Sequence, residues 1–240
     1  MTLGIRPTAD ADATISSARA RLDPEFASLL DPFLHQLEVD DETVVCGTWP
    51  DLRLAFLNKG WFLALKQHHP RPEESDRWGL GRNILDGIHG PLKSFFETNL
   101  RHCLEKSVPW HHRYECSSPN EFREYQMNVL PLPRQAGLLI LHFLTERRPH
   151  EERRVLHHPE EQTFRDRDGF IIQCSYCRRV RKADGEPSWH WVPEWVATSP
   201  SKTSHGLCRD CLLAYFDALV DVDSPAATSV PPNNVVRGDG

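Results

Sequence analysis

Two Cys-x-x-Cys pairs constrain this chain more than any other feature. Cys174 and Cys177 form the first pair, and Cys208 and Cys211 form the second after the thirty intervening residues 178–207. Two residues between cysteines allow a tight turn to direct both sulfurs to one point. Two such pairs complete a tetrahedron with Zn–S distances of about 2.3 Å. Because thiolates select zinc or iron over magnesium or calcium, the spacing predicts one structural zinc ion held by all four cysteines.

The residues beside the two pairs fit such a site. Four thiolates around Zn²⁺ carry a formal charge of about −2, which neighbouring cations can offset. Arg178 and Arg179 follow the first pair directly and are expected to supply positive charge. His205 precedes the second pair and is expected to pack beside the site, since four cysteines already complete the coordination.

Other uses of the cysteines stay open. In a reducing compartment, paired Cys-x-x-Cys motifs are metal or redox sites rather than a disulfide framework. A redox-active dithiol and an iron–sulfur cluster are therefore alternatives to zinc. A catalytic zinc ion would need an open coordination position, which four thiolates do not leave.

Charge and hydropathy argue against nucleic-acid binding, secretion and membrane association. The formal net charge of −6 at pH 7 gives no general attraction to nucleic acid or to anionic membranes, so nucleic-acid binding would depend on the short basic run 178–182. The first twenty residues lack the basic and apolar regions of a secretory signal. The longest apolar stretch, 136–141, is too short to span a bilayer. We therefore expect a cytoplasmic protein that does not bind membranes.

Hydrophobic periodicity predicts an α+β domain upstream of the cysteines. Pro24 begins a helical pattern, Asn58 can cap a second helix, and residues 91–106 form a third. Strands are predicted at 43–48, 52–57, 109–116, 121–130 and 137–145. Since the last strand is almost entirely apolar, we place it at the centre of an antiparallel sheet with helices on one face.

This order of elements resembles the PAS family of sensory domains over residues 40–146. Residues 51–58 resemble the second PAS strand with its terminal asparagine, and residues 81–85 resemble the start of the PAS helical region. Residues 109–145 resemble the closing three-strand meander. Lys59-Gly60 stands where many relatives have Pro-Ala, a departure that is confined to the local turn.

The resemblance implies a space between sheet and helices that binds a small molecule or a partner. The predicted lining residues are aromatic or aliphatic: Phe56, Trp61, Ile84, Phe95, Tyr114, Met127 and Leu139. Some PAS domains hold haem through a histidine, and His89 and His102 lie in the helical region where such a ligand would sit. Haem is not expected here, and no Cys-x-x-Cys-His attachment motif occurs. The histidine pairs, including His111-His112, are expected on the solvated surface.

A second resemblance covers the cysteine pairs. The segments CSYCRRVR (174–181) and SHGLCRDC (204–211) are similar to a cysteine-rich segment that follows PAS or receiver domains in bacterial signalling proteins. It implies a signalling context and no particular reaction.

Together these patterns predict a non-enzymatic bacterial sensory or regulatory protein with an unknown signalling partner. The protein itself is expected as a monomer or as a homodimer. No Walker loop, GxSxG or HExxH motif is present. The alternatives are a redox sensor that uses the cysteine pairs as switchable thiols and a zinc-ribbon nucleic-acid-binding protein. The predicted organisation begins with a disordered leading segment (1–24), a PAS-like domain with an N-terminal helix (25–146) and a connector (147–163). A small zinc-ribbon or zinc-knuckle module that ends in a helix (164–222) and a disordered tail (223–240) follow.

Overall fold

The structure, a computed structural model, describes most of the chain between residues 22 and 216. The described ranges are 22–31, 33–39, 43–68, 78–88, 91–150, 160–186 and 188–216. The predicted disordered tail, nearly all of the predicted leading segment and the middle of the predicted connector lie outside them. Among the described residues, no helix is long and apolar enough to cross a membrane.

The described chain divides into two compact units. The first unit comprises Met1–Gly87, Thr98–Trp110 and Asn128–Phe143. The second unit comprises Ile88–Glu97, His111–Met127 and Leu144–Gly240. Each unit has its own core.

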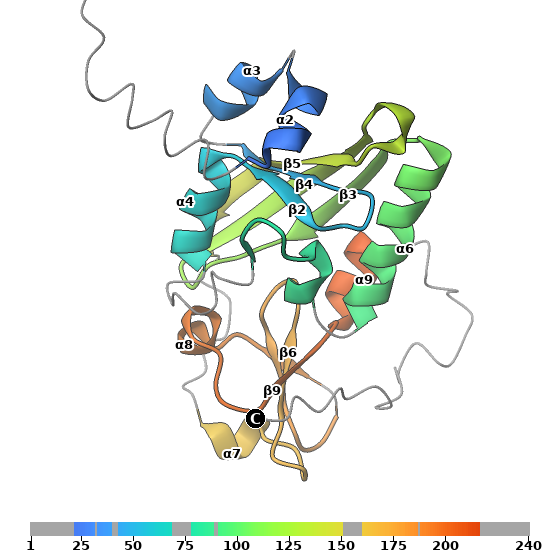
Figure 1. The fold of residues 1–240 in the computed structure, drawn as a ribbon. Helices are drawn as coiled ribbons and strands as arrows, with labels where there is room; N and C mark the ends of the chain where they lie inside the picture. Colours follow the sequence, from blue (N-terminus) through green and yellow to red (C-terminus); the bar gives the residue numbers. More distant parts are fainter. Residues whose placement is uncertain are drawn as a thin grey trace, which may run out of the picture. The chain divides into compact units, whose positions relative to one another are not determined.

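A five-stranded antiparallel sheet forms the larger of the two sheets and confirms the predicted α+β class (Figure 1). The strand order is β2-β1-β5-β4-β3. The strands are β1 (Val44–Thr48), β2 (Leu54–Leu57), β3 (Trp110–Glu115), β4 (Glu121–Pro131) and β5 (Leu138–Pro149). The apolar strand predicted to be central is β5, which is third of the five. In the middle of the sheet Cys46 lies opposite Leu57 on one side and Ile140 on the other.

Two short helices, α2 (Pro24–Leu30) and α3 (Leu34–Val39), form from the helical pattern that Pro24 begins. Asp23 caps α2 by accepting a hydrogen bond from the backbone N–H of Glu25. Phe26 and Leu30 then pack against residues of β1, β2 and β5 in the first unit. Gly47 makes room for this contact, because a Cβ atom there would lie 2.5 Å from Cε1 of Phe26.

Asn58 joins β1 to the helix that follows β2. Its Oδ1 accepts the N–H of Trp61 at 2.9 Å, which confirms the predicted cap of α4 (Lys59–His68). The same oxygen accepts the N–H of Val45 at 2.9 Å, and Nδ2 donates to the carbonyl of Thr43 at 2.7 Å. With 1% of its surface exposed, Asn58 fixes the start of α4 to the edge of the core.

The elements after α4 follow the prediction closely. A short 3-10 helix, η2 (Ile84–Gly87), precedes α6 (Pro91–Lys106), whose bounds match the predicted helix. A second 3-10 helix, η3 (Pro133–Gln135), joins β4 to β5. Strand β5 continues to Pro149, so the first three residues of the predicted connector are strand. An ion pair between Arg147 and Glu121, at 2.9 Å, ties this extension to β4.

A smaller mixed sheet with the order β8-β7-β6-β9 belongs to the second unit (Figure 1). Its strands are β6 (Ile171–Cys174), β7 (Val180–Arg181), β8 (Trp189–His190) and β9 (Thr203–Gly206). The helices of this region are α7 (Glu161–Phe164), α8 (Pro193–Ala197) and α9 (Arg209–Tyr215). Strands β6 and β9 pair in parallel, with Cys174 opposite Gly206. The carboxyl ends of both strands therefore lie side by side, and the cysteine pairs lie at these ends.

Candidate metal centre

The four cysteines converge on one point inside the second unit. Their sulfur atoms all lie within 4.8 Å of one another, and Cys177 Sγ is 3.6 Å from Cys208 Sγ. All four residues are at most 3% exposed. Tetrahedral coordination with bonds of about 2.3 Å has sulfur–sulfur edges of about 3.8 Å, so the spacing suits a small tetrahedral ion. The meeting of the two pairs, predicted from their spacing, is confirmed, and we call this group the cysteine cluster.

Strand β6 delivers the first pair. Cys174 is the last residue of β6, and its N–H donates to the carbonyl of Arg179 at 2.8 Å across the turn. The N–H of Arg178 donates back to the carbonyl of Cys174 at 3.1 Å. Arg178 closes this turn in the left-handed region, with φ of 63°. The loop thereby folds back on itself and directs both sulfurs inward.

Strand β9 and helix α9 deliver the second pair. Cys208 is the N-cap of α9, and its sulfur accepts the N–H of Cys211 at 3.4 Å. The N–H of Cys208 donates in turn to the sulfur of Cys174 at 3.4 Å. Backbone N–H groups at a helix start have no partner within the helix, so they can stabilise negative charge on sulfur. Helix α9 confirms that the small cysteine module ends in a helix.

Ionisation of Cys174 opposes ionisation of Cys177 and Cys211. Hydrogen bonds from the neighbouring thiols, that of Cys177 first, lower the pKa of Cys174. The hydrogen bond to Cys174 is in turn the main cause that raises the pKa of Cys177 and of Cys211, and burial raises both further. The Cys174 thiolate is therefore stabilised at the expense of the thiolates of Cys177 and Cys211. A bound cation would remove this conflict, which is why the donor set fits a metal ion.

The charged neighbours hold the two pairs to each other. Arg179 Nη1 contacts Asp210 Oδ2 at 2.6 Å, and Asp210 stands between Cys208 and Cys211 in the chain. His205 lies on β9 opposite Gln173 and is not one of the four clustered residues. The expected roles of Arg178, Arg179 and His205 in balancing or packing the site stay predictions.

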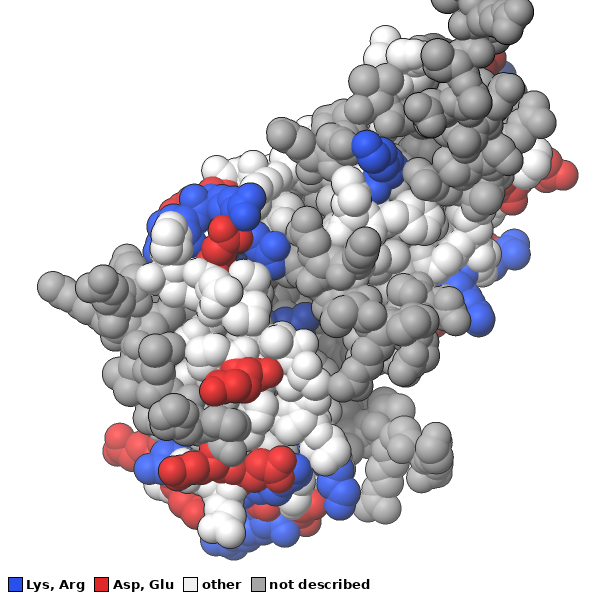
Figure 2. Space-filling view, turned by 90° about the vertical axis from the view of Figure 1, so that its left-hand side faces the viewer, with Lys and Arg blue, Asp and Glu red and all other residues white. Residues whose placement is uncertain are grey.

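Basic and acidic side chains are interspersed on the face of the molecule drawn in Figure 2. Within the basic run, the ion pair with Asp210 already engages Arg179. A nucleic-acid site requires a continuous basic surface, so neither observation favours one.

An aromatic layer packs directly against the cysteine cluster. Tyr176, which lies between the two cysteines of the first pair, is 3% exposed and its hydroxyl is 2.6 Å from Nε2 of His112. The ring of His112 packs against Phe95 at 5.2 Å and Phe216 at 5.3 Å between centroids. Burial lowers the pKa of His112 to about 4 and raises the pKa of Tyr176, so both groups are neutral at neutral pH.

The prediction that the histidine pair at 111–112 is solvated is wrong for His112, which is only 8% exposed. Alternation along β3 places His111 outward and His112 inward. The alternation of the strand could have predicted that His112 is buried, but the neighbouring residues are mostly polar and suggest an exposed segment.

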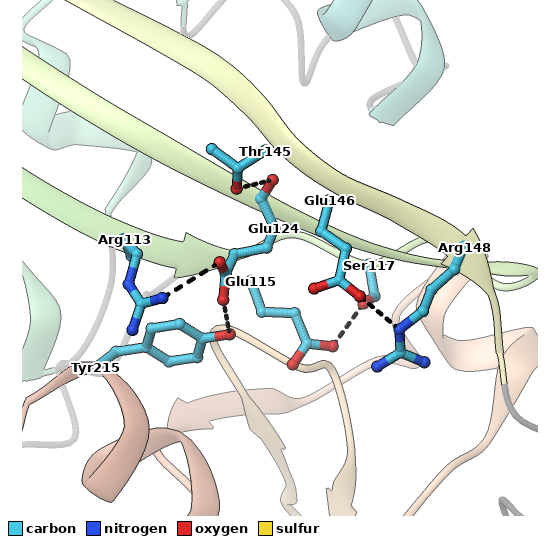
Figure 3. Close-up of polar contacts among 8 residues, drawn as sticks. All are labelled: Arg113, Glu115, Ser117, Glu124, Thr145, Glu146, Arg148 and Tyr215. Atoms are coloured by element: carbon cyan, nitrogen blue, oxygen red, sulfur yellow. Dashed lines mark hydrogen bonds and ion pairs between the residues drawn. The ribbon is translucent and has the colours of Figure 1, made fainter.

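A polar network attaches α9 to the strands of the second unit (Figure 3). The hydroxyl of Tyr215 donates to Glu124 Oε2 at 3.2 Å, and Arg113 Nη1 lies 3.6 Å from Glu124 Oε1. Thr145 donates to the backbone carbonyl of Glu124 at 3.0 Å. Glu124 thus connects the C-terminal end of α9 with β3, β4 and β5.

The predicted ligand-lining residues are distributed between two cores. Phe56 and Leu139 pack in one core cluster of the first unit. Phe95 and Tyr114 pack instead against the cysteine cluster in the second unit. The indole of Trp61 contacts that of Trp78 edge to face, with centroids 6.0 Å apart.

The remaining two lining residues are also buried. Ile84 is 8% exposed and belongs to the first unit, whereas Met127 is 4% exposed and belongs to the second. A pocket formed by all seven residues stays a prediction.

In comparisons with known proteins, no family model matches the chain and no curated protein matches its sequence.

Proposed function

We propose that the cysteine cluster binds one zinc ion and that this ion has a structural role in a PAS-like regulatory protein without enzymatic activity. The observation that carries the zinc assignment is the convergence of four buried sulfurs from two segments far apart in the chain. Zinc supplies a fixed tetrahedral junction there, and Cys174, Cys177, Cys208 and Cys211 supply its four ligands. Since the site is then closed, no substrate can reach the metal.

Three further observations support a structural role. The sulfurs of Cys174 and Cys208 accept backbone N–H groups, which suits thiolates that are permanently ionised. Arg179 ties the two pairs together through Asp210. The cysteines also make up four of the seven buried residues in their core cluster, so the surrounding side chains alone form only a small core.

The sheet supports the PAS-like part of the proposal. Two strands, a set of helical segments and three further strands follow one another in the order expected from the resemblance. The apolar β5 lies at the centre, and Asn58 ends β2 as the motif implies. On this proposal the PAS-like domain binds a small molecule or a protein partner, and the protein is a monomer or a homodimer. The zinc module then transmits the bound or free state of that domain to a signalling partner.

Metal analysis of protein purified under reducing conditions tests the zinc assignment. We expect one equivalent of zinc per chain, and loss of that zinc in Cys208→Ser. Cys116→Ser is the matched control, because Cys116 is a half-buried cysteine of the same unit that lies outside the cluster. Cobalt substitution should give the intense thiolate-to-metal absorption of tetrahedral sulfur coordination. Iron in place of zinc, or unchanged zinc in Cys208→Ser, would refute the assignment.

A redox sensor is the second candidate function. The 3.6 Å separation of Cys177 Sγ and Cys208 Sγ favours it, because these sulfurs need little movement to form a disulfide. Treatment with a mild oxidant separates the two functions. Zinc that survives the oxidant supports the structural role, whereas zinc release with disulfide formation supports the sensor.

A further inference from the structure

Tyr176 occupies the middle of the first ligand loop. It follows Cys174 by two residues and directly precedes Cys177. Its ring packs against Tyr215 at 5.4 Å and Phe216 at 5.3 Å between centroids, both at the end of α9. A residue so placed determines where the loop backbone lies, and therefore where the two sulfurs point.

The hydroxyl of Tyr176 is held from outside the loop. Its partner, Nε2 of His112, lies 2.6 Å away on β3. Three phenylalanines surround the imidazole, with centroid distances of 5.2 Å for Phe95, 5.8 Å for Phe96 and 5.3 Å for Phe216. Since the ring cannot turn freely in this packing, it fixes the position of the hydroxyl.

We infer that the His112–Tyr176 hydrogen bond positions the first ligand loop for the metal and couples metal occupancy to strand β3. This inference rests on the proposed metal site. Tyr176 and His112 are positioning residues, because neither is a member of the cysteine cluster. Linkage is reciprocal: if loss of the pair weakens metal binding, loss of the metal must loosen the pair and the strand that carries His112 by the same factor.

Tyr215 provides a matched control. It belongs to the same aromatic layer, and its hydroxyl also makes a hydrogen bond, at 3.2 Å to Glu124. Tyr215 lies outside both ligand loops, at the last residue of α9. Tyr215→Phe therefore removes a comparable hydroxyl from the same surroundings without altering the loop between Cys174 and Cys177.

The experiment measures zinc transfer to a chelator from Tyr176→Phe, His112→Phe, the double variant and Tyr215→Phe. Loss of one partner of a buried hydrogen bond should accelerate release about tenfold in each single variant. The double variant should release zinc no faster than either single variant, because both remove the same interaction. Tyr215→Phe should remain within about twofold of the wild type. Additive effects, or equal acceleration in Tyr215→Phe, would overturn the inference.

Two further measurements keep the inference open to refutation if a variant folds poorly. The visible spectrum of the cobalt-substituted protein should shift in Tyr176→Phe and not in Tyr215→Phe, because only the former alters ligand geometry. In the wild-type protein, metal removal should accelerate amide hydrogen exchange in β3, and unchanged exchange there would count against the coupling. A wild-type protein that binds no metal would instead refute the proposed metal site itself.

Discussion

Replacing Asn58 with alanine removes one side chain that forms hydrogen bonds with four backbone groups, those of Leu37, Thr43, Val45 and Trp61. The N–H of Val45 and the carbonyl of Thr43 lose their 2.9 Å and 2.7 Å bonds to this side chain in a buried position. A buried polar group left without such a bond costs about 1–3 kcal/mol. The N–H of Trp61 also loses its helix cap, which is worth about 1 kcal/mol. We therefore expect the free energy of unfolding to fall by about 4 kcal/mol, a large share of the roughly 5–15 kcal/mol typical of a domain.

Urea denaturation followed by circular dichroism measures this loss. Asn58→Asp should be damaging as well, because it keeps the acceptor oxygens but removes the donor to Thr43 and buries a charge. Asn120→Ala, at an exposed turn position, should change stability by less than about 0.5 kcal/mol. A loss below about 1 kcal/mol in Asn58→Ala would show that water or a backbone shift replaces these bonds, and that Asn58 does not fix α4 to the sheet.

Three other outcomes follow from the packing and the titration behaviour. Chelation of the metal under reducing conditions should unfold the small sheet, because binding of a structural zinc ion contributes about 10–16 kcal/mol to the free energy of folding. Trp191 and Trp195 are 2% and 6% exposed in the folded protein, so a red shift of their fluorescence would report the unfolding. Because the pKa of His112 is lowered to about 4, the unfolded chain takes up the proton first as the pH falls. The free energy of unfolding should therefore decrease between about pH 6.5 and pH 4, with His112 contributing up to about 3 kcal/mol. Burial lowers the pKa of His142 to about 4 as well, so pH-dependent denaturation of His112→Phe should show a smaller decrease than the wild type. Gly47→Val should cost about 1–3 kcal/mol in urea denaturation through its clash with the ring of Phe26, and a neutral result would mean that this helix contact can shift freely.

Local patterns made most of the fold and the cysteine cluster predictable. The Cys-x-x-Cys spacing is itself a local geometric pattern, so the four clustered cysteines could be named without knowing the path of the chain between them. Helix α6 and strand β5 could be predicted equally well from the sequence. Sixteen residues of helical periodicity indicate the helix, and an uninterrupted apolar run indicates the strand.

Long-range contacts account for what the sequence did not reveal. His112 and Tyr176 are 64 residues apart, and no local pattern indicates that they meet. The charge of Arg147 and Arg148 predicts a connector where the structure has the end of β5. These residues extend the strand through partners on β4, where Arg147 pairs with Glu121 and Arg148 lies 4.3 Å above the ring of Phe122. Charged strand ends of this kind become recognisable only when their opposing residues are known.

All four tyrosines of the chain gather in the second unit. Tyr125 stacks on Tyr114, Tyr114 contacts Tyr176, and Tyr176 contacts Tyr215. Biosynthetic incorporation of fluorotyrosine would therefore give a four-resonance fluorine spectrum that arises from this unit alone. Oxidants, chelators or candidate ligands could then be screened by their effect on this part of the protein, with no contribution from the other.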